Sequence, residues 1–212
     1  RYAGMDGIPA ATPTRPSEFT SVLAPFSAEV FGTGIPQSNA GIGPMALLVE
    51  PGGTVLASGG ANRAQLYRFA VDGGHVTAPV ATLDAPIFDL AYDSEGGLWA
   101  TTGGGQLLQL DPVSLAIVAR HGESVTQSLA IDPSTGKIYV STGNGIEIFD
   151  RVTGAFTLFS KYRVDDLAFS PTGELWATSW PARGDIVKFD QRGQPQVQVR
   201  LQERISSTIV KE

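Results

Sequence analysis

The chain has 212 residues, of which 42% are hydrophobic and 17% charged, with a net charge of −6 at pH 7 and no cysteine. The absence of cysteine excludes disulfides, thiolate metal sites and cysteine nucleophiles, and an acidic chain without a basic cluster argues against a nucleic-acid partner. The apolar runs are shorter than the roughly 20 residues that span a bilayer, so we expect no membrane span.

Residues 1–16 are rich in Pro, Ala and Thr and are typical of a linker or N-terminal extension. The first residue is Arg1 instead of methionine, so we expect an internal or processed start from which a secretory signal has been removed. The expected location is therefore extracytoplasmic, that is periplasmic, secreted or on the cell surface.

The rest of the chain, 17–212, divides into repeats about 40 residues long. We predict four complete repeats at 43–84, 85–124, 125–163 and 164–204, with partial pieces at 17–42 and 205–212. In the first piece, Phe19–Ile35 is predicted to form the outer two strands of a preceding repeat. In the last piece, Ile205–Val210 matches the innermost strand of the fourth repeat.

Each repeat has the same four predicted strands, here lettered a to d. Strand a contains a recurring leucine, an Asp/Ser-Pro-x-Gly type of turn follows, strand b carries a large apolar side chain, and c and d follow with more polar residues. Alternation with a period of two, bounded by Gly, Pro and Asp, indicates antiparallel hairpins. The recurring leucines are Leu47, Leu90, Leu129 and Leu167, and the large strand-b residues are Leu56, Trp99, Tyr139 and Trp176.

Four strands in about 40 residues is the size of one blade of a β-propeller. We therefore predict an all-β fold, a β-propeller built of four-stranded antiparallel blades. A β-sandwich would also give alternating strands, but it does not explain why one pattern recurs. Two arrangements stay open: a five-bladed ring closed by joining the two partial pieces, or a fragment of a larger ring. The unequal pieces and the start without methionine favour the fragment.

The turn and strand motifs also resemble known propeller families. The third repeat, Ile131–Thr142, is similar to the YVTN repeat, and Gly97–Thr101 and Glu174–Thr178 resemble blades of NHL, SMP-30/gluconolactonase and streptogramin-lyase-like propellers. The resemblance covers about 43–201 and implies the fold. These families include lactonases, a lyase and binding proteins, and their enzymes depend on a divalent metal. No metal-ligand position matches here, so the resemblance does not choose a function.

The candidate site residues lie in the d–a and b–c connections, which share one face of a propeller. Asp89, Ser128 and Asp166 directly precede strand-a leucines, and Asp165 is next to the last of them. Carboxylates near a common axis can hold Ca²⁺ or Mg²⁺, but such aspartates more often cap turns or accept hydrogen bonds from backbone amides. A metal requirement is left open.

The b–c loops are glycine-rich, which lets a ligand approach the backbone closely, although simple turn geometry explains the glycines equally. Their candidate ligand-binding residues are Asn62, Arg63, Asn144, Trp180 and Arg183. Trp180 with Arg183 would make an aromatic and cationic contact. His75 and His121 are expected near the rim, away from the axis and from each other.

No catalytic motif is visible, so we expect a noncatalytic domain for binding or scaffolding within a larger exported protein, without a cofactor. Its expected partner is a protein or glycan ligand, or another segment that completes the propeller. The alternative is a metal-dependent lactonase- or lyase-like enzyme with an axial cation. A quinone-cofactor propeller would need a Trp docking pattern that this sequence lacks.

Overall fold

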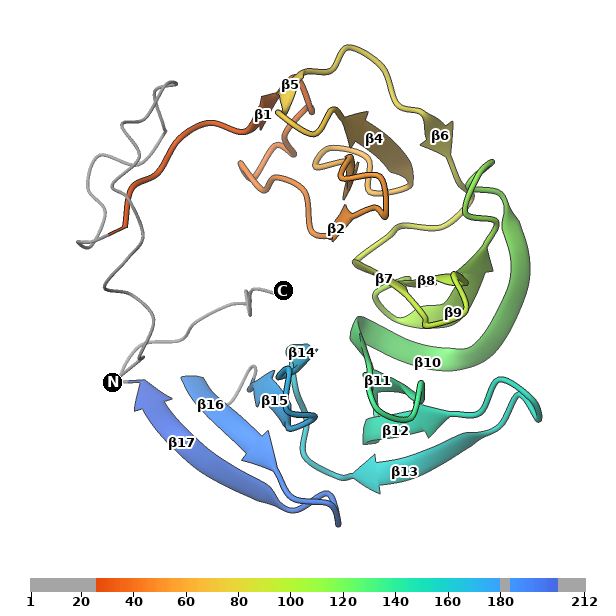
Figure 1. Cartoon of the computed structure of the whole chain (residues 1–212), viewed down its shortest axis with the longest axis vertical. Coiled ribbons are helices and arrows are strands. Elements are labelled where there is room, and N and C mark those ends of the chain that lie inside the picture. The colour runs from red at the N-terminus through yellow and green to blue at the C-terminus, as the bar shows by residue number, and fades with distance from the viewer. Residues whose placement is uncertain (1–25, 180–183, 202–212) are drawn as a thin grey trace.

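The computed structural model describes residues 26–179 and 184–201. The regular secondary structure of these ranges consists of strands. The ranges contain no helix, and therefore no helix that could cross a membrane. Four antiparallel four-stranded groups, here called blades 1 to 4, stand around a centre with β2, β7 and β14 turned toward it (Figure 1). The predicted all-β architecture of four-stranded antiparallel sheets is confirmed.

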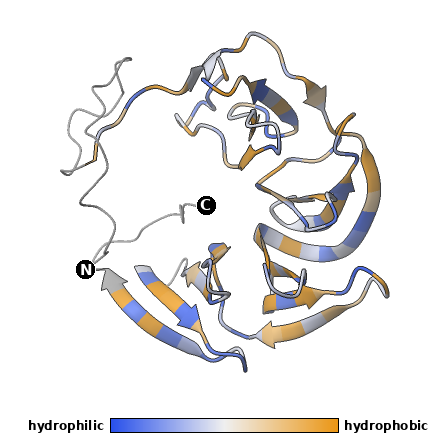
Figure 2. Cartoon of the chain, in the orientation of Figure 1, coloured by the Kyte–Doolittle hydropathy of each residue, from blue (hydrophilic) through white to orange (hydrophobic). Residues whose placement is uncertain are grey.

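Blades 1 and 4 are separate sheets. Blade 1 contains β2 (Leu47–Val49), β3 (Val55–Ser58), β4 (Gln65–Phe69) and β6 (Ala81–Thr82), in that order across the sheet. Blade 4 contains β14 (Asp166–Phe169), β15 (Leu175–Thr178), β16 (Gly184–Phe189) and β17 (Pro195–Leu201). Hydrophobic and hydrophilic residues alternate along β17, as expected of a strand near the rim (Figure 2).

Blades 2 and 3 are joined through one long strand, β10 (Ile117–Ile131). Its first part pairs with β9 and its last part pairs with β11, so it is strand d of blade 2 and strand a of blade 3. The register shifts near Val125, where the strand passes from one blade to the next. The other strands are β7 (Asp89–Tyr92), β8 (Leu98–Thr101), β9 (Gly105–Leu110), β11 (Ile138–Thr142), β12 (Gly145–Phe149) and β13 (Phe156–Ser160).

The segment before blade 1 is described from residue 26 onward. The described part of Phe19–Ile35 forms one short strand, β1 (Gly32–Thr33), which pairs in parallel with β5 (Gly74–His75) in the connection between β4 and β6. Phe31 packs edge-on against Phe69 with the ring centroids 6.0 Å apart. The described part of this segment therefore covers apolar surface of blade 1. The two outer strands expected over Phe19–Ile35 stay a prediction, because residues 19–25 lie outside the described residues. The expected linker at 1–16 and the expected strand at Ile205–Val210 lie outside the described residues.

The a–b turns place a glycine in the left-handed region, with φ between +68° and +84°: Gly53, Gly96, Gly136 and Gly173. The c–d turns of blades 3 and 4 use Gly154 and Gly193 in the same way. In blade 2 this position is Leu115, with φ +60°. A left-handed leucine is strained, but its side chain is buried between blades 1 and 2, and that burial offsets the strain.

The hydrophobic core consists of wedges between neighbouring blades. One cluster contains Leu56 of blade 1 and Leu90 of blade 2. A second contains Trp99 of blade 2 and Leu129 of blade 3. A third contains Tyr139 of blade 3 and Leu167 of blade 4. The strand-a leucines of blades 2, 3 and 4 are thus buried by strand b of the preceding blade. The large strand-b side chains fill the wedges.

The two ends of the array lack this packing within the described part of the chain. Leu47 is 63% exposed, whereas its equivalents Leu90, Leu129 and Leu167 are 1% exposed or less. At the other end, Trp176 is only half-buried, while Trp99 is buried. Lys188 lies over the Trp176 ring, with its Nζ 5.8 Å from the ring centroid.

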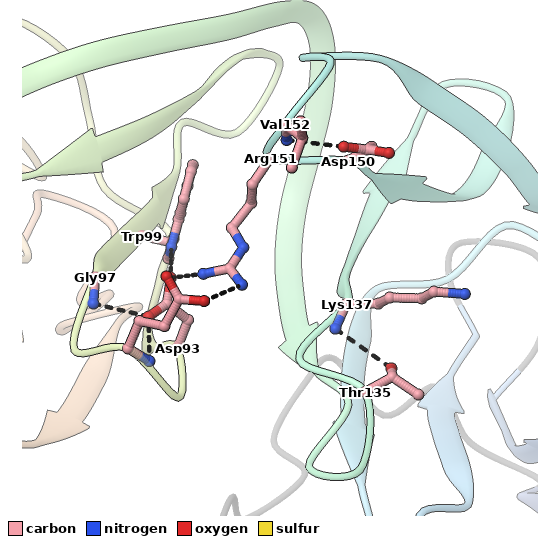
Figure 3. Close-up of polar contacts among 9 residues, drawn as sticks. Asp93, Gly97, Trp99, Thr135, Lys137, Asp150, Arg151 and Val152 are labelled. Carbon is pink, nitrogen blue, oxygen red and sulfur yellow. Dashed lines mark hydrogen bonds and ion pairs between the residues drawn. The ribbon is translucent and has the colours of Figure 1, made fainter.

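A polar network ties blade 2 to blade 3 on the face of the a–b and c–d turns (Figure 3). Asp93 Oδ1 accepts hydrogen bonds from the backbone N–H groups of Glu95 (2.9 Å) and Gly97 (2.8 Å). Its Oδ2 accepts a hydrogen bond from Trp99 Nε1 (2.8 Å) and forms an ion pair with Arg151 Nη1 (2.7 Å). Burial alone would raise the pKa of Asp93, but these hydrogen bonds and the Arg151 charge together lower the pKa below its ordinary value.

Candidate functional site: a cleft between blades 1 and 2

A cleft of about 460 Å³ opens on the face formed by the b–c and d–a connections. Three segments contribute to it: the b–c loop of blade 1, the connection from blade 1 to blade 2, and the b–c loop of blade 2. Both Asn62 and Arg63, which the sequence indicated as ligand-binding candidates, line it. The full lining is Ala61, Asn62, Arg63, Ala64, Leu83, Asp84, Ala85, Pro86, Phe88, Thr102 and Gly103.

Arg63 is held in place from both its backbone and its side chain. Asn62 Oδ1 accepts a hydrogen bond from the Ala64 N–H at 3.0 Å, a turn that Asn forms readily. The Arg63 carbonyl accepts one from the Ile87 N–H at 2.9 Å. The guanidinium lies over the Phe88 ring, 5.2 Å from its centroid. Its Nε is buried and has no hydrogen-bond partner among the described residues.

The Phe88 ring is positioned by the glycine-rich loop of blade 2. The Phe88 N–H donates to the Thr101 carbonyl at 2.9 Å, and the Gly103 N–H donates to the Thr126 carbonyl at 2.9 Å. Gly103 has φ +71°, and a Cβ at this position would overlap the Phe88 ring. Glycine is therefore required at position 103 for two reasons: the left-handed backbone conformation and the close approach of the Phe88 ring.

The cleft has a local positive charge. Asp84 at its rim is paired with Arg120 of β10, whose Nη2 lies 2.7 Å from each carboxylate oxygen. The hydrogen bond from Arg120 lowers the pKa of Asp84, so this carboxylate is ionised and its charge is already compensated. Arg63 has no ion-pair partner among the described residues, so its charge is the one left uncompensated in the lining.

The axial candidates are engaged with backbone groups. Asp89 Oδ1 accepts from the Leu90 N–H (2.9 Å), and its Oδ2 accepts from the Leu129 N–H of the next blade (2.8 Å). Asp166 Oδ1 accepts from the Leu167 N–H at 2.9 Å in the same way. Asp89 therefore joins two inner strands at the centre.

The other inner-strand candidates are also placed by hydrogen bonds. The Ser128 N–H donates to Ser141 Oγ at 2.9 Å, while Ser128 Oγ is buried without a partner among the described residues. The Asp165 N–H donates to the Thr178 carbonyl at 2.8 Å. No group of three or more His, Asp or Glu side chains is placed to hold a metal ion in the part of the chain that the structure describes.

Asn144, another candidate, is not part of the cleft lining. The Asn144 N–H donates to Thr142 Oγ1 at 3.1 Å in the b–c loop of blade 3. Trp180 and Arg183 lie outside the described residues. His75 is exposed beside Thr33, whereas His121 packs against Phe149 with ring centroids 4.7 Å apart. The two histidines belong to separate places in the fold.

The sequence did not single out Asp84, Phe88 or Gly103 as members of one site. One signal was available: Asp84–Phe88 directly precedes an inner strand and so lies on the same face as the b–c loops. That places the segment on the face where the cleft opens, but the contact of Arg63 with Phe88 depends on how the two blades pack.

No protein-family model matches the sequence, and no curated protein matches it. Solved structures do match. Virginiamycin B lyase from Staphylococcus aureus superposes with a TM-score of 0.54 at 18% identity over 74% of this chain. A gluconolactonase from Xanthomonas campestris gives 0.56 at 17% over 74%, and an auxiliary nutrient binding protein from Bacteroides ovatus gives 0.59 at 14% over 75%. The chain is a β-propeller.

The lyase and the gluconolactonase belong to the propeller group that the blade motifs resembled, so the resemblance is confirmed at the level of the fold. The chain spans 55%, 62% and 42% of the lengths of the lyase, the gluconolactonase and the nutrient binding protein. Because both enzymes and a binding protein share this fold, function has to be argued from the site.

Proposed function

We propose that this chain is a noncatalytic ligand-binding part of a β-propeller protein and that the cleft beside Arg63 is its binding site. The observation that carries the proposal is the state of Arg63: a cation fixed on an aromatic ring, with a buried Nε that lacks a partner, at the wall of an open cleft. A buried donor left unsatisfied costs about 1–3 kcal/mol.

Two further observations support a larger exported protein around this site. The exposed Leu47 and Val49 occupy strand-a positions, and the strand-a leucines of the other three blades are buried by a preceding blade, so another segment or chain that covers blade 1 would bury them. One similar structure is the extracellular domain of a putative one component system from B. thetaiotaomicron. The nutrient binding protein among the similar structures is consistent with a binding role.

The test is to map fragment binding by NMR on the ¹⁵N-labelled chain and to fill the cleft with Ala85→Trp. Fragments that shift the Gly103 and Arg63 amide signals should bind at least about tenfold more weakly to this variant. Ala155→Trp, on an exposed turn of the opposite face, serves as the control and should bind like the unchanged chain. Fragment binding that Ala85→Trp leaves unchanged would contradict the proposal.

A metal-dependent enzyme of the lactonase or lyase kind is the second candidate. Its support is the pair Asp89 and Asp166, which stand at equivalent positions of inner strands, together with the lyase and gluconolactonase among the similar structures. We favour binding because both Asp89 oxygens already accept backbone hydrogen bonds. Calorimetry with Ca²⁺ and Mg²⁺ decides between them: saturable binding that Asp89→Asn abolishes would favour the enzyme.

A further inference from the structure

The chemical class of the ligand can be argued from Arg63 itself. The guanidinium lies on the Phe88 ring, which packs against Gly103, and the Phe88 backbone N–H is hydrogen-bonded to the Thr101 carbonyl. A guanidinium fixed in this way is a preorganised planar fork, and little side-chain entropy is lost when it binds a partner. Its natural partner is a planar group with two acceptor oxygens, which in small molecules is the carboxylate.

The charges around the cleft indicate how many negative charges the ligand carries. The whole chain is acidic, with a net charge of −6, yet the cleft lining has one uncompensated positive charge because Arg120 already neutralises Asp84. A single carboxylate balances this charge. A phosphate dianion or a polyanion would carry more negative charge than this single cation balances.

Neutral polar groups of the lining are available for the rest of the ligand. Asn62 uses its Oδ1 within the loop, and its Nδ2 has no partner among the described residues. Thr102 Oγ1 donates to the Gln106 carbonyl at 2.9 Å and so can still accept a hydrogen bond. Leu83, Ala85 and Pro86 contribute apolar surface to the same lining.

We propose that the cleft binds a small monocarboxylate and that Arg63 pairs with its carboxylate. This inference rests on the proposed function of the cleft and deepens it. The ligand body is either aromatic or hydroxylated, since the lining offers both apolar surface and hydrogen-bonding groups.

The test uses two matched pairs of probes, each an acid with its neutral counterpart: benzoate with benzamide, and galacturonate with galactose. Binding is followed through the ¹H–¹⁵N signal of Arg63 Nε, which is sensitive to a carboxylate bound by the same guanidinium. We expect at least one acid to shift this signal saturably, with a dissociation constant in the millimolar range or tighter, and its neutral counterpart to leave it unchanged. The acid that binds identifies the kind of ligand body.

The variants are Arg63→Gln, which removes the charge, and Arg63→Lys, which keeps the charge but not the fork. We expect at least about tenfold weaker binding of the acid to Arg63→Gln and an intermediate loss for Arg63→Lys. Arg192→Gln, at an exposed turn of blade 4, is the matched control and should bind like the unchanged chain. Thermal unfolding followed by circular dichroism shows that each variant is folded.

Equal binding of acids and neutral counterparts, unchanged acid binding to Arg63→Gln, or no binding of either acid overturns the inference. Its failure is distinguishable from failure of the proposed function. If neutral fragments bind the cleft and Ala85→Trp weakens them, the cleft is a binding site and only the carboxylate assignment is wrong. If no fragment is sensitive to Ala85→Trp, both are wrong.

Discussion

Replacing Asp93 by asparagine tests how much the network between blades 2 and 3 contributes to stability. The asparagine Oδ1 keeps the two turn hydrogen bonds, but an NH₂ group takes the place of Oδ2 and faces two donors, Trp99 Nε1 and Arg151 Nη1. Breaking a buried ion pair by removing one partner costs about 3–5 kcal/mol. Because the Arg151 side chain is 28% exposed and can be hydrated, we expect the lower end, about 3 kcal/mol.

The matched control is Asp132→Asn, at the equivalent turn of blade 3. Asp132 Oδ1 accepts from the Ser134 N–H at 2.8 Å, and its Oδ2 accepts from the Thr135 hydroxyl at 2.6 Å. A hydroxyl can rotate and accept a hydrogen bond from the new NH₂ group, so the expected cost is below about 1 kcal/mol. Urea unfolding followed by circular dichroism measures both values. Equal losses for the two variants would refute the assigned role of Arg151 and Trp99.

The same pair gives a pH dependence with a definite sign. The folded-state pKa of Asp93 is lowered from its ordinary value of 3.8, so its carboxylate stabilises the fold above that pH. This stability is lost as the pH falls through the lowered pKa. The difference in stability between the unchanged chain and Asp93→Asn should therefore be constant above about pH 5 and shrink in more acid solution. A difference that does not change with pH would contradict the assignment.

Three further predictions concern the wedges and the cleft. Leu129→Ala should cost about 2–5 kcal/mol in urea unfolding, whereas Leu47→Ala should cost under about 1 because Leu47 is exposed. Burial lowers the pKa of His121 below 6.5, so the chain should lose stability relative to His121→Phe as the pH falls from about 7 to 5, measured by thermal unfolding. Gly103→Ala should displace the Phe88 ring and weaken binding of the acid that pairs with Arg63 about tenfold or more in the NMR titration, while the chain stays folded.

Local patterns in the sequence were sufficient for the strands and the turns. Alternation with a period of two depends on the pleat of a single strand, and the left-handed glycines depend on a single turn, so both can be recognised without the fold. The exception is Leu115, which takes a left-handed turn position that glycine has in the next two blades. Only its burial between two blades makes that conformation acceptable.

The site was partly accessible from the sequence. The glycine-rich loops indicated the face on which the cleft opens, and Asn62 and Arg63 were among the residues expected there. The contact of Arg63 with Phe88 and the pairing of Asp84 with Arg120 join residues of different blades. No local pattern encodes such contacts, because they depend on the angle and distance at which two blades pack.

By itself, the sequence determined that each repeat is a four-stranded antiparallel unit with an apolar inner strand and a large side chain on the second. The tertiary structure decided which of these equivalent residues are buried. Leu47 and Leu129 have the same place in the repeat, yet Leu47 is 63% exposed and Leu129 is fully buried. The physical reason is that hydrophobic stabilisation depends on the surface removed from water, and that surface is set by a neighbouring blade and not by the residue's own strand.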